Sequence, residues 1–110
     1  MLLPNRDLAI VDLRKLQDYC LSSDHPRGRH KARVFLNALD LSSEDADWLA
    51  DRLRFAAQNF QVAEGISDEF GDRFIIDFDI TRGRKSAQVR SCWIVLREEK
   101  IPRFVSCYVL

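Results

Sequence analysis

The chain has no net charge, no long apolar run and few glycines, and each shortage excludes a class of protein. Its 17 Lys and Arg residues balance 17 Asp and Glu residues, which argues against a generic polyanion binder, since such proteins are clearly basic. No run approaches the roughly 20 apolar residues that a membrane helix needs, so we expect no membrane contact. The four glycines are scattered and form neither a phosphate-binding loop nor a dinucleotide fingerprint.

Cysteine and histidine are also scarce. The three cysteines are widely spaced, which predicts reduced thiols, and Cys92 and Cys107 lie in apolar, strand-like runs typical of a core. His25 and His30 lie beside no cysteine and have no metal-ligand spacing, so we expect neither a metal nor another cofactor. Polar residues interrupt the apolar N-terminus, so we see no signal peptide and expect a cytoplasmic protein.

The 110 residues, 46% of them hydrophobic, predict a single domain over residues 1–110 with a real core. Apolar residues recur at helical spacing in the first half. We expect a helix over about residues 11–21 and a second one starting near Pro26 with Asp24 as its N-cap. A third should begin at Ser42, where Ser42 and Asp45 form a variant of the capping box.

The second half alternates with a period of two, which is typical of half-buried strands. We expect strands near residues 62–66, 73–80, 87–96 and 102–110. Residues 87–96 are apolar on both faces of their second half, so this strand should be central. The sequence therefore predicts an α+β fold, with about three N-terminal helices packed on one face of a three- to four-stranded antiparallel meander.

The zero net charge conceals segregated charge. Residues 27–33 and 82–90 each carry +4, whereas residues 40–51 and 64–79 each carry −5. The two basic segments form one basic face if the fold brings them together; otherwise they are separate solvated surfaces. Asp77 and Asp79 share one strand face, which is more typical of a solvated surface than of a cation site. The candidate substrate-binding residues are Arg27, Gly28, Arg29, Arg82 and Arg84.

The densest local signal is a His-Pro-x-Gly-x-x-Lys segment that starts at His25. On a helical wheel at 100° per residue, Gly28 and Lys31 fall on one flank of the apolar stripe and Arg29 falls on the other. A glycine in a helix costs up to ~1 kcal/mol relative to alanine, which close approach of a backbone or ligand would justify. Alternatively, Gly28 relaxes the turn after Pro26 and Lys31 extends past the core edge.

Together with Leu3–Asn5, Val89–Val95 and Pro102–Tyr108, the His25–Phe35 segment resembles a small, uncharacterised bacterial domain family. That family occurs as stand-alone proteins and at the C-termini of polymorphic toxins, so the resemblance implies a toxin or toxin–antitoxin role. Its members commonly end in a Thr-Ala-Tyr-Pro-like sequence. Here Ser106 keeps the hydroxyl, but the following small residue and the final proline differ.

The order of helices and meander also resembles the barnase/EndoU/colicin/RelE-like ribonuclease fold. That resemblance implies metal-independent cleavage of RNA by 2′-OH attack. His25 could then act as acid or base, because the ordinary histidine pKa is near neutrality. Lys31 and Arg90 could hold the phosphate, and Ser106 or Tyr108 could donate a hydrogen bond.

Two hypotheses follow from the sequence. A toxin-like endoribonuclease acting on RNA requires the five candidate catalytic residues to converge on one cleft. A non-catalytic module that binds a cognate antitoxin or another protein predicts instead an exposed apolar patch or a free sheet edge. The oligomeric state has no signature in the sequence. The five candidate catalytic residues are His25, Lys31, Arg90, Ser106 and Tyr108.

Overall fold

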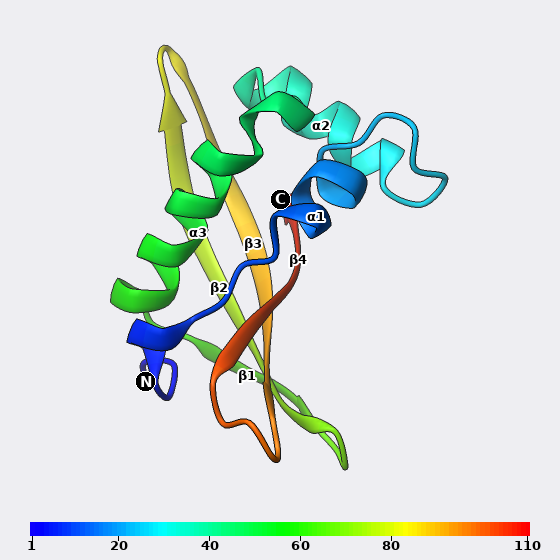
Figure 1. Ribbon diagram of the computed structural model, residues 1–110. Coiled ribbons are helices and arrows are strands. Elements are labelled where there is room, and N and C mark those ends of the chain that lie inside the picture. Colours follow the sequence, from blue (N-terminus) through cyan, green and yellow to red (C-terminus); the bar gives the residue numbers. More distant parts are fainter.

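The computed structural model describes all residues from 1 to 110 and places the helices before the strands (Figure 1). The helical elements are η1 (Arg6–Leu8), α1 (Leu13–Lys15), η2 (Leu16–Cys20), α2 (Arg29–Leu39), η3 (Ser43–Asp45) and α3 (Ala46–Asn59). The strands are β1 (Ala63–Ser67), β2 (Gly71–Arg82), β3 (Lys85–Leu96) and β4 (Pro102–Val109). None of the helices combines the length and the apolar character that crossing a membrane would take.

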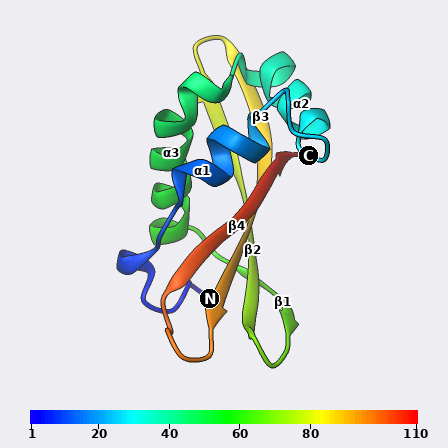
Figure 2. The ribbon, with the colours of Figure 1, turned by 45° about the vertical axis from the view of Figure 1, so that its right-hand side comes forward.

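The four strands form one antiparallel sheet in the order β1-β2-β3-β4, which is a simple meander. Figures 1 and 2 show the helices gathered on one side of this twisted sheet. From Phe74 to Ile80 and from Val89 to Val95 every second residue is buried, so one face of the sheet is covered and the other is open. The predicted α+β fold is confirmed, including the central place of β3.

The covered face of the sheet carries a small polar network inside an apolar core. The indole N–H of Trp93 donates to the Ser91 hydroxyl, which donates to the Ile76 carbonyl, each over 2.9 Å. Trp93 also packs edge-on against Phe104, with ring centroids 5.6 Å apart. Every polar side-chain group of the network has a partner, so Ser91 is buried without an unsatisfied donor or acceptor.

The first helix exists where expected, but it widens after one turn. The Leu21 amide donates to the Leu16 carbonyl over 2.9 Å, which is the i+5 spacing of a π-helical turn. Leu16 and Cys20 at the two ends of η2 are fully buried. The wider turn thus keeps both residues on the core side.

The start of α2 differs from the prediction, because Asp24 does not cap it. The imidazole Nδ1 of His25 accepts hydrogen bonds from the backbone amides of Arg27 and Gly28, each over 3.0 Å. The Arg29 amide donates to the His25 carbonyl over 2.9 Å. His25 therefore satisfies the amides that a short N-cap side chain would otherwise satisfy, and the helix begins at Arg29.

The predicted boundary of the third helix is confirmed. The Ser42 amide donates to the Asp45 carboxylate over 2.9 Å, and the reciprocal bond of a capping box is also present. Between β2 and β3, Gly83 has a φ of 62°, which allows a tight two-residue turn between Arg82 and Lys85.

The two edges of the sheet are treated differently. The N-terminal segment covers the start of β4, where the Ile10 amide donates to the Pro102 carbonyl and the Phe104 amide donates to the Ile10 carbonyl, each over 2.9 Å. At the other edge, all five residues of β1 are exposed. The pairing of β4 with β3 also shifts by one residue at Val105, between the Cys92–Ser106 and Trp93–Phe104 pairs. This bulge resets the outward-facing positions of β4.

Gly28 lies where another backbone comes close. A Cβ at this position would be 2.1 Å from the Tyr19 carbonyl oxygen, so the glycine lets the first turn of α2 touch η2. Gly28→Ala is therefore expected to lower the free energy of unfolding by about 1–3 kcal/mol, the usual cost of overpacking, in a chemical denaturation experiment. Gly83→Asn is the control, because its Cβ meets open space and asparagine tolerates positive φ. Equal losses from the two variants would contradict the close-contact explanation.

Candidate functional site

Lys31 lies at the centre of a cluster of hydroxyl groups and aromatic rings. Its ammonium donates to the Ser106 hydroxyl over 3.2 Å and to the Tyr19 hydroxyl over 3.3 Å. It also lies 4.9 Å from the ring centroid of Tyr19 and 5.5 Å from that of Tyr108. No carboxylate lies within 4.0 Å of it, so its positive charge is held only by neutral oxygens and aromatic faces.

Three elements converge to build this cluster. The buried face of α2, with Ala32 and Phe35, sets Lys31 on the flank of the helix, as the wheel predicted. The π-helical turn η2 supplies Tyr19, and β4 supplies Ser106 and Tyr108 after its bulge. The close contact at Gly28 holds η2 against α2.

Arg90 extends the cluster across the sheet. Its Nε and Nη2 donate to the two carboxylate oxygens of Asp77 over 2.8 and 2.9 Å, and Asp77 is its direct cross-strand partner. On its other side Arg90 pairs with Tyr108 of β4. The hydrogen bonds to Asp77 and then to Tyr108 raise the pKa of Arg90, and the bond from Arg90 lowers the pKa of Asp77. A permanently charged guanidinium is thus fixed beside Tyr108.

His25 joins the cluster through Tyr19, because the two rings meet edge-on with centroids 4.7 Å apart. Its Nδ1 already accepts two backbone amides, so the proton of the neutral ring sits on Nε2. Protonating Nδ1 would turn an acceptor into a donor facing those two amides. The geometry therefore leaves His25 a free Nε2–H donor.

All three cysteines, which are free thiols, lie close enough to feel the charge of Lys31. Cys20 and Cys107 are fully buried. A hydrogen bond from Cys107 lowers the pKa of the Cys20 thiol to about 7, and burial raises the pKa of Cys107. Burial also raises the pKa of Cys92, which is only half-buried on the open face of the sheet and so less of a core residue than expected.

A pocket of about 290 Å³ adjoins the cluster. Lys31 and Tyr108 line it, together with three residues that the sequence did not single out for a site. Its wall is therefore continuous with the hydroxyl groups that hold the ammonium. The five lining residues are His30, Lys31, Val34, Tyr108 and Val109.

The basic segment of residues 82–90 is largely neutralised by the acidic segment of residues 40–51. Arg82 pairs with the Asp45 carboxylate over 3.0 Å and also donates to the Asp40 carbonyl over 2.6 Å. Lys85 pairs with the Asp40 carboxylate over 3.0 Å. Arg82, a predicted substrate-binding residue, thus fastens the hairpin to the helices, and Arg84 is exposed at the hairpin tip without an ion pair.

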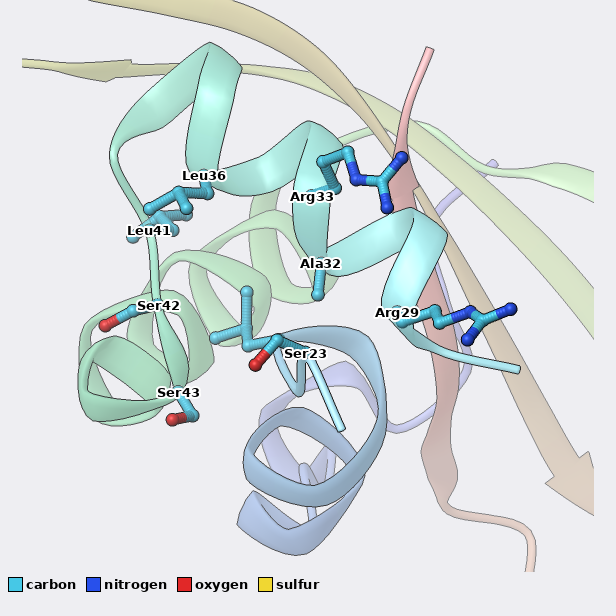
Figure 3. A pocket seen from close by; sticks show the side chains of 9 residues that line it. Ser23, Arg29, Ala32, Arg33, Leu36, Leu41, Ser42 and Ser43 are labelled. Atoms are coloured by element: carbon cyan, nitrogen blue, oxygen red, sulfur yellow. The ribbon is translucent and has the colours of Figure 1, made fainter. Parts of the chain in front are cut away.

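The basic segment of residues 27–33 is not neutralised, since none of its four basic side chains forms a salt bridge. Arg29 and Arg33 lie on the flank of α2 opposite Lys31, beside a second pocket of about 300 Å³ whose apolar lining includes Leu36 and Leu41. Figure 3 shows both arginine side chains pointing away from the serines of that pocket. The two basic segments adjoin near Tyr108, which lies between Lys31 and Arg90.

The structure thus brings four of the five candidate catalytic residues into direct contact and links the fifth, His25, through Tyr19. Sequence reasoning missed two residues of the cluster. Tyr19 falls within the helix predicted over about residues 11–21, and Asp77 falls on the strand face interpreted as solvated. Only the contact at Gly28 and the register of β2 with β3 reveal their positions.

The chain is thus an α+β domain in which a helical layer covers an antiparallel meander, and a cationic cluster lies at the edge strand β4. The family model of DUF6883, a domain of unknown function, matches residues 2–110, so the chain belongs to that family. A comparison with curated protein sequences finds no significant match. A chain of a contact-dependent growth inhibition toxin–immunity protein complex from Klebsiella pneumoniae 342 shares the fold, with a TM-score of 0.73 at 15% identity. The match covers 92% of this chain and 99% of that one.

The Asp77–Arg90 pair should make stability depend on pH. The pKa of Asp77 is lowered in the folded state, so the pair stabilises the fold above the ordinary aspartate pKa, and this contribution disappears as pH falls through the folded pKa. Asp77→Asn should therefore unfold more easily than wild type at pH 7, and the difference should shrink below about pH 4. Asp79→Asn, which removes an exposed carboxylate without an ion pair, is the control. Denaturant titrations across pH 2–7 test this, and a constant difference for Asp77→Asn would contradict it.

Proposed function

We propose that the domain is a toxin-like endoribonuclease that cleaves RNA through attack of a 2′-hydroxyl on the adjacent phosphodiester. The observation that carries this proposal is the Lys31 cluster, where a cation without a carboxylate partner lies among hydroxyl groups. Such a group binds an anion without first breaking an ion pair. The chain's own Lys31 and Arg90 would supply the positive charge, and the reaction would require no cofactor.

Stabilisation of charge is the main contribution that these residues would make. A phosphodiester gains negative charge as it becomes pentavalent, and fixed donors aimed at its oxygens lower the barrier. Lys31 would contact one non-bridging oxygen, and Arg90 would contact another, since Asp77 holds its guanidinium in place. The hydroxyl groups of Ser106 and Tyr108 would supply further hydrogen bonds.

The hydrogen bonds of the His25 ring suit a role other than general acid or base. Its Nδ1 is occupied and its Nε2 carries the proton, so it would donate a hydrogen bond to a phosphate oxygen rather than exchange a proton. The 2′-hydroxyl would lose its proton to water as its oxygen attacks phosphorus. The 5′-oxygen would depart with a proton from Lys31 or Tyr108, leaving a 2′,3′-cyclic phosphate and a 5′-hydroxyl end.

Two further observations support a place in a toxin system. A solved structure that shares the fold is that of a toxin–immunity protein complex. The un-neutralised Arg27, Arg29 and Arg33 add positive charge before α2 and on its flank opposite Lys31, where RNA phosphates outside the reacting bond would bind. A cognate immunity or antitoxin protein is then the expected protein partner.

The exposed β1 edge favours a second candidate, a protein-binding module. All five residues of β1 are exposed, and Ile66 there is 72% exposed, while the nearby Phe70 is 64% exposed. An open strand edge with apolar residues beside it suits the addition of a strand from a partner protein. This surface is separate from the Lys31 cluster, so the two activities are compatible.

Lys31→Met tests the ribonuclease, because it removes the charge and keeps the length of the side chain. Wild-type protein should cleave a single-stranded RNA and leave cyclic phosphate ends, and Lys31→Met should lower the rate by about 100-fold or more. The fold should persist, since removing the charge of Lys31 leaves no carboxylate without its partner. Lys100→Met, at an exposed loop lysine whose side chain makes no hydrogen bond, is the control and should retain the wild-type rate.

Product analysis by gel electrophoresis and thermal unfolding of each variant complete the test. RNA in which each 2′-hydroxyl is replaced by hydrogen should resist cleavage, because the attacking group is gone. The ribonuclease proposal fails if concentrated wild-type protein leaves RNA intact, or if Lys31→Met cleaves as fast as wild type. In either case a pull-down with immobilised partner, compared between wild type and a charged β1 variant, would test the binding module.

A further inference from the structure

The pocket beside Lys31 combines apolar walls with a cation, and this chemistry suits one largely apolar group attached to an anion. It measures about 290 Å³, and Lys31 and Tyr108 belong both to it and to the ammonium cluster. We propose that this pocket binds the nucleobase next to the phosphate held by Lys31, and so sets which nucleotide flanks the cleaved bond. This inference rests on the proposed ribonuclease function and names the part of the RNA that the same site reads.

The side chains that line the pocket suit an aromatic ring system. Val34 and Val109 offer aliphatic surfaces, and Tyr108 adds an aromatic side chain. Val34 is 44% exposed although it lies on α2, whose other face is in the core. A nucleobase has apolar faces that pack against such side chains, and proteins that read single-stranded RNA commonly place unstacked bases against aromatic residues.

The charge of the site selects a nucleotide over a neutral aromatic ligand. Lys31 has no carboxylate partner, so an anionic group can meet its charge without displacing one. Inorganic phosphate would satisfy Lys31 but leave Val34 and Val109 uncovered. A nucleoside phosphate places an anion at one end and an apolar ring at the other, which matches both halves of the pocket.

His30 supplies polar contacts at the rim. Its side chain is exposed and makes no hydrogen bond to the protein. A neutral imidazole offers one donor and one acceptor, which is what recognition of a base edge uses. His30 would therefore distinguish among bases, whereas Val34 and Val109 would bind any of them.

The second pocket, on the opposite flank of α2, supplies a matched control. It has a similar volume of about 300 Å³ and also contains an exposed aliphatic residue of α2, Leu36, which is 50% exposed. It contains no aromatic residue, and its cations are the guanidinium groups of Arg29 and Arg33 rather than the Lys31 ammonium. Its hydroxyl groups come from serines alone. Val34→Phe and Leu36→Phe thus each narrow one pocket with the same side chain at an exposed position of the same helix.

Titrations followed by NMR measure binding without requiring cleavage. The probes are the four ribonucleoside 3′-monophosphates and inorganic phosphate, each added to wild type, Val34→Phe and Leu36→Phe. We expect at least one nucleotide to bind wild type about ten-fold or more tightly than phosphate, with shifts at Val109 and Tyr108. The Val34→Phe variant should bind that nucleotide no more tightly than phosphate, whereas Leu36→Phe should keep the wild-type preference. Inorganic phosphate should bind all three proteins with the same affinity.

The same variants separate this inference from the ribonuclease itself. On a mixed-sequence RNA, Val34→Phe should change the pattern of cleaved positions, and His30→Ala should weaken the base preference. If wild type cleaves RNA but Val34→Phe gives the same pattern and rate, the nucleobase pocket is wrong and the ribonuclease stands. If nucleotides bind with the expected dependence on Val34 but RNA stays intact, the pocket stands and the ribonuclease is wrong. Nucleotides that bind no tighter than phosphate overturn the pocket.

Discussion

The contact between Gly28 and the Tyr19 carbonyl fixes the geometry on which the candidate site depends. It presses the first turn of α2 onto the π-helical turn η2, so that Lys31 from one element meets the Tyr19 hydroxyl from the other. His25 secures the same junction by accepting two amides at the start of α2. The His-Pro-x-Gly-x-x-Lys segment is therefore both a structural joint and the source of the central cation.

The positions of the charged residues say more about this protein than their sum does. Basic residues at the β2–β3 hairpin pair with acidic residues at the end of α2 and the start of α3, which ties the sheet to the helices. The basic residues of α2 have no such partners. The net charge of zero is therefore distributed unevenly: the joint is neutralised, the positive charge around Lys31 is unpaired, and unpaired acidic residues elsewhere in the chain balance it.

Much of the fold could be predicted from the sequence, because hydrophobic periodicity is a local property. The alternation in residues 73–80 and 87–96 gave the strands and the central position of β3, and Ser42 and Asp45 marked a helix start. The cap at α2 could not be predicted, since a histidine side chain took the place of Asp24. Its role depends on how Pro26 directs the chain, which periodicity does not report.

The candidate site was predictable in its residue types but not in its contacts. Lys31, Ser106 and Tyr108 were named from a motif and a resemblance, and the structure places them together. The positions of Tyr19 and Asp77 could not be predicted because tertiary contacts set them: the Gly28 contact for Tyr19, and the register of β2 with β3 for Asp77. The pairing of Arg90 with Asp77 on one side and with Tyr108 on the other exists only once three strands are aligned.

The contrast between the two edges of the sheet has a consequence for how this domain could be controlled. The β4 edge is occupied by the N-terminal segment and the helices, whereas β1 is open. A strand added at β1 would extend the sheet at the edge farthest from β4, and the Lys31 cluster would stay accessible. A partner bound at β1 would therefore leave the Lys31 cluster open, and a partner that covers the cluster would have to bind at the opposite edge.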